Sequence, residues 1–328
     1  MANLETTYMG LALKNPFVVA ASSISSMVDR VQMAERAGAG ALVIRSLFEE
    51  QIQFDAMRME QDLAAGSESF PESLSYFPQL KHGGADEHLS WVEKTRAAVK
   101  LPLIASLNAL SPGAWTTYAR KLEATGVDAL ELNVYAVPTD PKKDAAAIEQ
   151  ELYQIVESVR GEVKVPVAVK LSPYYTSVAN VAAQLDQRGA QALVLFNRFL
   201  QPDIDPQSES LHREMVYSTP QELRLPLRWV ALLYGRIQAD LALNTGVHSG
   251  LDAAKAFLAG AMVIQTASAL LINGIPYLST MIQELTGWME EHGYERLDDF
   301  RGKLSQKQAD DPFTFERAHY VRLLMDQK

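Results

Sequence analysis

Polar residues follow each of the short apolar runs in this chain, and their types indicate the chemistry of a site. They carry hydroxyl, amide and cationic groups, and we find no carboxylate among them. Metal ions prefer Asp, Glu or His ligands, and paired-carboxylate hydrolysis needs two acids. We therefore expect an anionic ligand held by many hydrogen bonds. The set is Ser22, Ser23, Arg45, Ser46, Ser106, Asn108, Asn133, Lys170, Ser172, Asn197, Asn244, Thr245, Gln265 and Ser268.

Lys170 is the most informative of these residues because it interrupts the apolar run Val167–Leu171. A buried lysine is costly unless it meets a negative partner. The alternative is that its stem carries the ammonium out to solvent. A position in the middle of a buried strand leaves little room for that escape. The sequence therefore predicts that Lys170 faces an anionic group.

Two turns near the C-terminal end of the chain indicate where a phosphate would bind. They are Asn244-Thr245-Gly246 and Ala267-Ser268, each directly after an apolar run. Backbone N–H groups and short helix starts at such positions commonly hold phosphate. The alternative is ordinary turn chemistry, because Gly and Ser are common in turns everywhere. His248 follows the first turn, and we read it as a cap rather than a base.

The elements that must position these residues alternate along the chain. Each apolar run is continuous, as expected of parallel strands buried on both faces, and amphipathic stretches separate the runs. Eight such repeats predict an α/β protein and a closed (β/α)8 barrel, with residues 1–328 as one domain. The predicted strands are Phe17–Ser22, Ala41–Ser46, Leu103–Leu107, Ala129–Val134, Val167–Leu171, Ala192–Asn197, Asp240–Gly246 and Ala261–Ala267. The predicted helices include Val28–Ala37, Trp115–Ala124, Ala145–Arg160, Val178–Gln187, Leu251–Leu258, Tyr277–His292 and Asp311–Asp326.

Local repeats support this count of strands. Strands two, four, six and eight each follow a glycine suited to ending a helix: Gly38, Gly126, Gly189 and Gly260. Strands three and five share a different entry that ends in proline. Long loops follow strand two, over Leu47–Glu87, and strand six, over Arg198–Pro226. Long loops at the C-terminal ends of barrel strands usually cover a ligand.

The composition excludes several classes of function. The 328 residues are 48% hydrophobic and carry a net charge of -10, which argues against nucleic acid and anionic membranes as partners. With no cysteine there can be no disulfide, thiolate metal site or cysteine nucleophile. No signal peptide is visible at Met1–Gly10, and no apolar run is long enough to span a bilayer. We expect a soluble cytoplasmic protein that acts on a small molecule.

With these motifs in place, the chain resembles the dihydroorotate dehydrogenase family over nearly its whole length, and most closely a divergent, dihydroorotate dehydrogenase-like branch. The order and spacing of several short motifs agree together. They are Asn15-Pro16-Phe17, Ile44-Arg45-Ser46, Leu132-Asn133, Val169–Tyr174, Phe196–Phe199, Ser218–Arg224, Thr245-Gly246, Gly260-Ala261 and Gln265–Leu270.

The resemblance implies an FMN-dependent oxidoreductase that oxidises dihydroorotate or a related CH–CH substrate, and it implies a homodimer. Lys170 would lie beside flavin N1 and O2, while Asn133 and Asn197 would face the substrate. Arg45 would replace a lysine that touches both flavin and substrate. The catalytic set is thus Lys170, Asn133, Arg45 and Asn197. The cofactor-binding set is Ala20, Ala21 and Ser22 at the ring, Arg45, Ser46, Asn108, Asn133 and Lys170 around it, and Ser218, Thr219, Gly246, Ala267 and Ser268 at the phosphate; no residue is assigned to a metal.

Three departures from the family pattern concern the substrate rather than the flavin. Ala136 stands where the family has a Cys or Ser base, and alanine cannot accept a proton. Arg45 keeps the charge of the lysine that it replaces but not its geometry. The Asn-rich substrate loop of the family reads Ser73–Pro78 here.

Two alternatives therefore stand beside an FMN-dependent dehydrogenase. One is an FMN-binding protein without dihydroorotate dehydrogenase activity, serving as an electron carrier or partner subunit. The other is a flavin-free aldolase or isomerase in which Lys170 forms a Schiff base. The apparent lack of carboxylates around Lys170 disfavours this second alternative.

Overall fold

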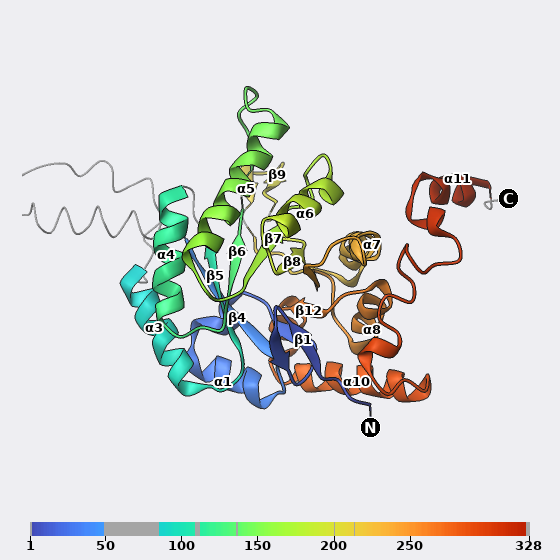
Figure 1. Ribbon diagram of the computed structural model, residues 1–328, viewed down its shortest axis with the longest axis horizontal. Coiled ribbons are helices and arrows are strands. Elements are labelled where there is room, and N and C mark those ends of the chain that lie inside the picture. Colours follow the sequence, from blue (N-terminus) through green and yellow to red (C-terminus); the bar gives the residue numbers. More distant parts are fainter. Residues whose placement is uncertain are drawn as a thin grey trace, which may run out of the picture.

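Eight parallel strands form a closed barrel in the order β11-β12-β3-β4-β5-β6-β7-β8 (Figure 1). The computed structural model describes residues 2–48, 85–108, 112–135, 137–199, 201–212 and 214–325. This architecture confirms the predicted fold, and all eight predicted strands are present. The barrel strands are β3 (Phe17–Val19), β4 (Ala41–Phe48), β5 (Leu103–Asn108), β6 (Ala129–Asn133), β7 (Val167–Leu171), β8 (Ala192–Leu195), β11 (Asp240–Asn244) and β12 (Val263–Thr266).

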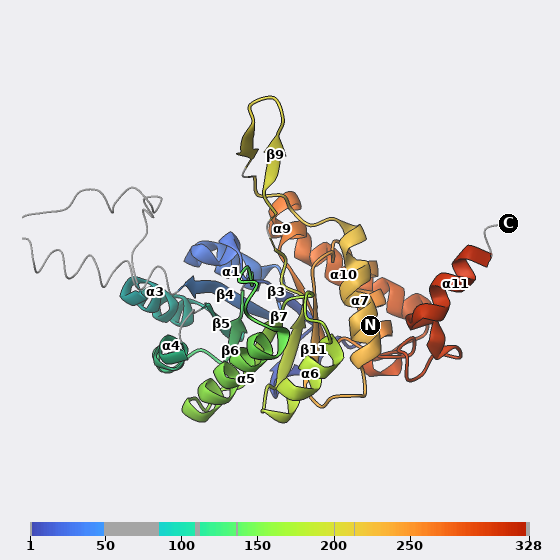
Figure 2. The ribbon, with the colours of Figure 1, turned by 90° about the horizontal axis from the view of Figure 1, so that it is seen from above.

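Helices follow the strands and surround the barrel (Figures 1 and 2). Helix α6 has the predicted bounds, and the other predicted helices shift by a few residues, as helix ends commonly do. The predicted last helix, Asp311–Asp326, divides into the short η5 (Pro312–Phe315) and α11. The helices are α1 (Val28–Arg36), α3 (Ala85–Ala98), α4 (Pro112–Ala124), α5 (Ala145–Glu162), α6 (Val178–Gln187), α7 (Arg224–Leu233), α8 (Gly250–Ala259), α9 (Ser268–Asn273), α10 (Tyr277–Glu291) and α11 (Arg317–Met325).

The four repeated glycines have positive φ angles, from +82° at Gly126 to +117° at Gly260. A Cβ at Gly260 would also lie 2.4 Å from the ring of Tyr234. The glycine therefore serves both the left-handed helix end and the close packing behind it.

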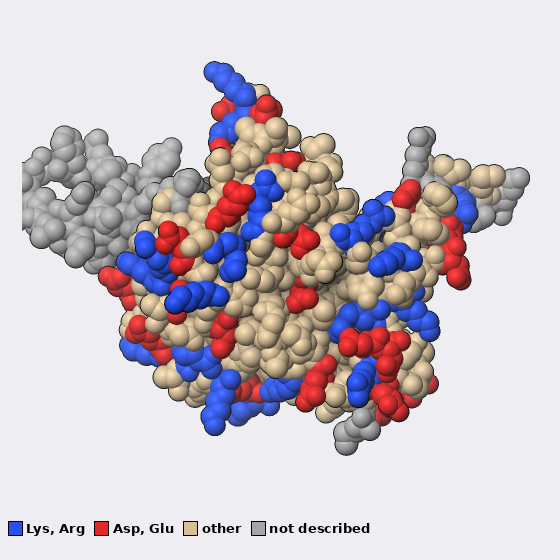
Figure 3. Space-filling model, in the orientation of Figure 1, with Lys and Arg blue, Asp and Glu red and all other residues tan. Residues whose placement is uncertain are grey.

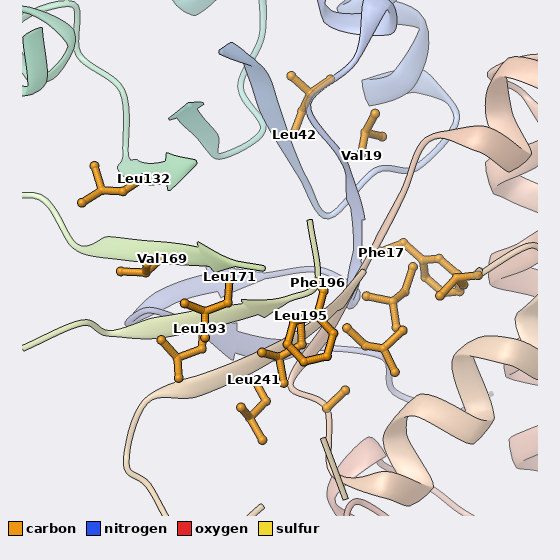
Figure 4. Close-up of a cluster of buried hydrophobic side chains, with 14 of the residues drawn as sticks. Phe17, Val19, Leu42, Leu132, Val169, Leu171, Leu193, Leu195, Phe196 and Leu241 are labelled. Carbon is orange, nitrogen blue, oxygen red and sulfur yellow. The ribbon is translucent and has the colours of Figure 1, made fainter. Parts of the chain in front are cut away.

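The outer faces of the strands pack against the helices and form the main core. Figure 4 shows part of this cluster, including Val169, Leu171 and Leu193 on neighbouring strands. The inner faces form a second cluster of smaller side chains, which the N-terminal hairpin of β1 (Thr6–Tyr8) and β2 (Leu11–Leu13) closes at one end. Tyr8 of this hairpin is fully buried, and the Met9 N–H donates to Asp240 Oδ2 at 2.7 Å. The hairpin thus plugs the barrel, and the strands' carboxyl ends remain free for a ligand.

The segment after β8 is the long loop predicted to follow strand six. It contains a projecting hairpin of β9 (Asp203–Asp205) and β10 (Ser210–His212), visible in Figure 2, and then η3 (Pro220–Leu223) before α7. Most of the long loop after strand two lies outside the described residues, including Tyr76 and Phe77 of the Ser73–Pro78 segment.

On the face seen in Figure 3, acidic and basic side chains are interspersed. Among the described residues, no helix is both long and apolar enough to cross a membrane.

Candidate active site

A buried ion pair between neighbouring strands lies inside the barrel. Lys170 on β7 is 7% exposed and Glu131 on β6 is 1% exposed. Lys170 Nζ is 3.8 Å from Glu131 Oε1, and Gln265 Nε2 donates to Glu131 Oε2 at 2.6 Å. The lysine therefore stays in the interior rather than reaching bulk solvent. Our expectation that no carboxylate lies beside it was wrong, because Glu131 sits within an apolar run and not at its end.

A chain of hydrogen bonds joins the ends of four strands. Ser46 Oγ and Ser106 Oγ are 2.8 Å apart, and Asn133 Nδ2 donates to Ser46 Oγ at 3.3 Å. Asn197 Nδ2 in turn donates to Asn133 Oδ1 at 2.5 Å. The chain brings together three residues of the predicted site, Ser46, Asn133 and Asn197. It gives the site a row of neutral donors and acceptors.

The two predicted phosphate-binding turns line one pocket of about 170 Å³. Thr245 and Gly246 there have φ angles of +79° and +80°. A Cβ at Gly246 would lie 2.3 Å from the Leu223 nitrogen, so only glycine permits this approach of two backbones. The pocket is lined by Ala20, Ala21, Lys170, Asn197, Arg198, Ser218, Asn244, Thr245, Gly246, Val247, Gln265, Thr266, Ala267 and Ser268.

Ser218 reaches this pocket from the cover segment, which we define as residues 214–223 between β10 and α7. Its N–H donates to Ser268 Oγ at 3.0 Å, and its hydroxyl is 3.1 Å from His248 Nε2. The His248 N–H donates to Asp252 Oδ2 at 3.1 Å. His248 therefore contacts a residue that lines the pocket without lining the pocket itself. Its isolated position in the sequence gave little sign of this contact.

Arg198 fastens the cover segment to the end of β8. Its Nε is 2.9 Å from Glu222 Oε1, and its guanidinium donates to the carbonyls of Val216 and Tyr217. Glu222 also accepts from the Thr219 N–H at 2.6 Å, as part of a capping box at η3. The contacts of Arg198 thus hold the cover segment over this pocket, together with those of Ser218.

The predicted site residues fall into three groups. Eight line the pocket: Ala20, Ala21, Lys170, Asn197, Ser218, Gly246, Ala267 and Ser268. Ser46 and Asn133 join it through hydrogen bonds, and Asn108 is buried at the end of β5. Three have other surroundings, since Ser22 caps the short η1 (Ser23–Ser26), Thr219 caps η3 and the side chain of Arg45 is exposed. Ala136 and Ser73–Pro78 lie outside the described residues.

Aromatic side chains stand beside the loop after β6. The rings of Tyr135 and Phe199 are stacked with centroids 4.3 Å apart, and Tyr174 meets Phe199 edge-on at 5.4 Å. Together with Val137 and Ile148 they line a mainly apolar cavity of about 620 Å³. The lining of this cavity is less polar than that of the pocket at Gly246 and Ser268.

A family model described as dihydroorotate dehydrogenase matches residues 3–289. The chain belongs to the dihydroorotate dehydrogenase family. This confirms the family predicted from the sequence, and with it the oxidoreductase class.

Curated relatives cover almost the same region at low identity. A dihydroorotate dehydrogenase B (NAD(+)) catalytic subunit of Methanothermobacter thermautotrophicus is 26% identical, covering 91% of this chain and 97% of the relative. The corresponding subunit of Thermoplasma volcanium is also 26% identical, with 92% and 98% covered. A chloroplastic dihydropyrimidine dehydrogenase (NADP(+)) of Arabidopsis thaliana is 23% identical, with 93% and 77% covered.

The residues present in this family member fit FMN. The backbone approach at Gly246 leaves a cradle that a side chain would fill. Lys170 supplies a buried cation at the pocket wall. Gln265 Oε1 is a buried acceptor that has no hydrogen-bond partner in the described part of the chain. A cation, hydroxyl and amide groups, and turns suited to phosphate are what an anionic flavin nucleotide needs.

Proposed function

We propose that this protein is an FMN-dependent oxidoreductase that oxidises a CH–CH bond in a small cyclic substrate. The observation that carries the proposal is the pocket in which buried Lys170 meets the turns at Gly246 and Ser268. Family membership supports it independently. Residues 1–328 would then form one FMN-binding barrel.

The proposed roles follow from the positions of the side chains. Ser218, Gly246, Ala267 and Ser268 would hold the phosphate, because they line one pocket at the ends of β11 and β12. Lys170 would lie against the electron-rich edge of the ring, where a cation stabilises negative charge. Bound FMN supplies the hydride acceptor for the reaction.

Asn133 and Asn197 would orient the substrate, since their mutual hydrogen bond fixes both amides at the strand ends. Arg45 would reach the substrate from within β4, where its side chain is exposed. The relatives are named for dihydroorotate and dihydropyrimidine substrates. We therefore propose that the substrate is a dihydropyrimidine or a ring of similar size, and that the protein acts in pyrimidine biosynthesis.

A second candidate is an FMN-binding protein that does not oxidise dihydroorotate. The observation that favours it is the loop after β6, where Tyr135 is stacked on Phe199 and Ala136 replaces the family's base. Alanine cannot accept a proton, so residue 136 offers no base. Such a protein would pass electrons between partners instead.

Membership of the dihydroorotate dehydrogenase family argues against the aldolase alternative. One argument against it from the sequence was wrong, because Glu131 does lie beside Lys170.

Spectroscopy of the purified protein tests the proposal. We expect the visible absorbance of oxidised flavin, and anaerobic bleaching of that absorbance by dihydroorotate or dihydrouracil. Bleaching by either probe rejects the electron-carrier candidate. A purified protein that neither contains FMN nor binds added FMN contradicts both candidates.

The setting that we propose is a cytoplasmic homodimer acting on a small molecule, without nucleic acid or membrane partners. The absence of cysteine and the net charge of -10 support this setting. Exposed apolar side chains on the projecting hairpin, Ile204 and Leu211, support association with a second copy. Sedimentation of the Ile204→Ser, Leu211→Ser double variant as a monomer beside a dimeric wild type would support that contact.

A further inference from the structure

The carboxylate of Glu131 connects opposite sides of the barrel. In the closed strand order, β6 and β12 are four places apart, so they face each other across the interior. Gln265 Nε2 of β12 nevertheless donates to Glu131 Oε2 of β6 at 2.6 Å. Lys170 comes from β7, the neighbour of β6, and its Nζ lies 3.8 Å from Glu131 Oε1. Three strands thus meet at one carboxylate.

Glu131 lies behind the site rather than in its wall. Both of its partners, Lys170 and Gln265, line the pocket at Gly246 and Ser268, whereas Glu131 does not. On the other side lies the N-terminal hairpin, where burial raises the pKa of Tyr8 well above its ordinary range and the nearby charge of Glu131 adds to the effect. The carboxylate therefore sits between the plug and the pocket.

Lys170 and Glu131 compensate each other's buried charge with little help from other described groups. Among the residues that the structure describes, Glu131 Oε1 has no hydrogen-bond partner, and Gln265 is the one hydrogen-bond donor to this carboxylate. A buried charge needs an opposite charge nearby, and removing one partner of such a pair leaves the other uncompensated. The ammonium of Lys170 can therefore interact both with Glu131 and with an anionic ligand in the pocket.

We propose that Glu131, held by Gln265, is a positioning residue that fixes the ammonium of Lys170 at the pocket and lowers the net positive charge there. It thereby sets the reduction potential of the bound flavin. This inference rests on the proposed function for its redox part, and on the ion pair alone for its positioning part.

The redox part is tested on the flavin-loaded protein with Glu131→Gln, which keeps the shape and removes the charge. With the opposing charge gone, Lys170 stabilises the anionic reduced ring more strongly, and the midpoint potential rises. We expect reduced flavin to gain about tenfold in affinity relative to oxidised flavin, which corresponds to about 30 mV for a two-electron couple.

Glu151→Gln is the control, because Glu151 is a half-exposed acid on α5 and its loss changes the net charge equally. We expect it to keep the wild-type potential. A Glu131→Gln protein that holds flavin at the wild-type potential overturns the inference. If this variant does not fold, Glu131→Asp withdraws the charge from Lys170 by one methylene, and an unchanged potential in that variant overturns it equally.

The positioning part is tested without flavin, by thermal unfolding of the flavin-free protein. We expect Glu131→Gln and Lys170→Met each to lower the melting temperature, and the double variant to melt above at least one of the single variants. Additive losses overturn the pair. If the two substitutions are coupled in a protein that does not bind FMN, the proposed function is rejected and the ion pair is kept. If the protein binds FMN and the two substitutions are not coupled, the ion pair alone is rejected.

Discussion

Asn197 Nδ2 donates to Asn133 Oδ1 at 2.5 Å, and this bond joins the end of β6 to the segment that follows β8. Two strands separated by β7 thereby present their amides at the same place. Asn133 Nδ2 also donates to Ser46 Oγ, so Ser46 is linked to the same pair of amides. The substrate side of the site is therefore a connected unit rather than two independent side chains.

Replacing Asn197 with alanine should weaken this unit without unfolding the barrel. The change removes the hydrogen-bond donor to Asn133 Oδ1 and, in the proposed function, a contact to the substrate. Loss of one such hydrogen bond costs about 1–3 kcal/mol, so we expect roughly a tenfold to hundredfold fall in kcat/KM. The measurement is the anaerobic rate at which dihydroorotate or dihydrouracil reduces the bound flavin.

Asn180→Ala supplies the control for that rate, because Asn180 is exposed on α6. Equal rates in the Asn197→Ala protein and this control would remove Asn197 from the proposed substrate site.

Gly246→Ala should damage both folding and cofactor binding. The residue has φ +80°, where an alanine costs about 1–2 kcal/mol. Its Cβ would also lie 2.3 Å from the Leu223 nitrogen, which forces the cover segment outward. We expect a lower melting temperature and at least tenfold weaker FMN binding, measured by differential scanning calorimetry and fluorescence titration.

Gly287→Ala is the matched substitution for comparison. Gly287 lies within α10 and has an ordinary φ, and no atom of the described residues would come within 4 Å of an added Cβ. We expect it to stabilise the fold by about 0.5–1 kcal/mol and to leave FMN affinity unchanged. If Gly246→Ala behaved like Gly287→Ala, the cradle at Gly246 would have no role.

Most of the barrel could be predicted from the sequence because its signals are local. A buried parallel strand reads as a continuous apolar run, and a helix that ends at Gly126 or Gly260 needs only one residue type to show it. The same logic found Lys170 within a strand, and Gly246 and Ser268 just after the strands that precede them. Local patterns therefore identified the elements and much of the pocket.

The remainder of the site depends on contacts between residues that are distant in the sequence. Glu131 was missed because a single acid within an apolar run gives no sign of which residues it faces, and its partner Gln265 is 134 positions away. Arg198 and Glu222 form their pair only because the cover segment folds back over the end of β8. His248 likewise acquires a role only when Ser218 reaches it.

Ser268→Ala should reveal which part of the ligand the cover segment recognises. Ser268 Oγ accepts the Ser218 N–H at 3.0 Å and faces the proposed phosphate. Loss of the hydroxyl should lower FMN affinity about fivefold to tenfold, equivalent to roughly 1 kcal/mol, but should change riboflavin affinity by less than about twofold. The two titrations compare a ligand with phosphate to one without it. Equal losses for both ligands would contradict a phosphate site at this corner.

His88→Gln should remove a pH dependence of stability that originates beside the site. Burial lowers the pKa of His88 from its ordinary value of 6.5, and its Nε2 lies 3.1 Å from the carbonyl oxygen of Arg45. Since the folded pKa lies below the unfolded one, the unfolded chain binds more protons between the two values. The contribution of His88 to stability is therefore complete above pH 6.5 and is lost as the pH falls toward the folded pKa.

Glutamine has no charge to gain, so this loss should be absent from the His88→Gln protein. We expect the wild type to lose more free energy of unfolding than this variant between about pH 7.5 and pH 5, the range in which histidines titrate. His212→Gln provides the comparison, because His212 is exposed on the projecting hairpin and its replacement should leave the wild-type curve unchanged. Urea unfolding at a series of pH values gives the three curves. Parallel curves for the wild type and His88→Gln would contradict the burial of His88 against the Arg45 carbonyl in the folded protein.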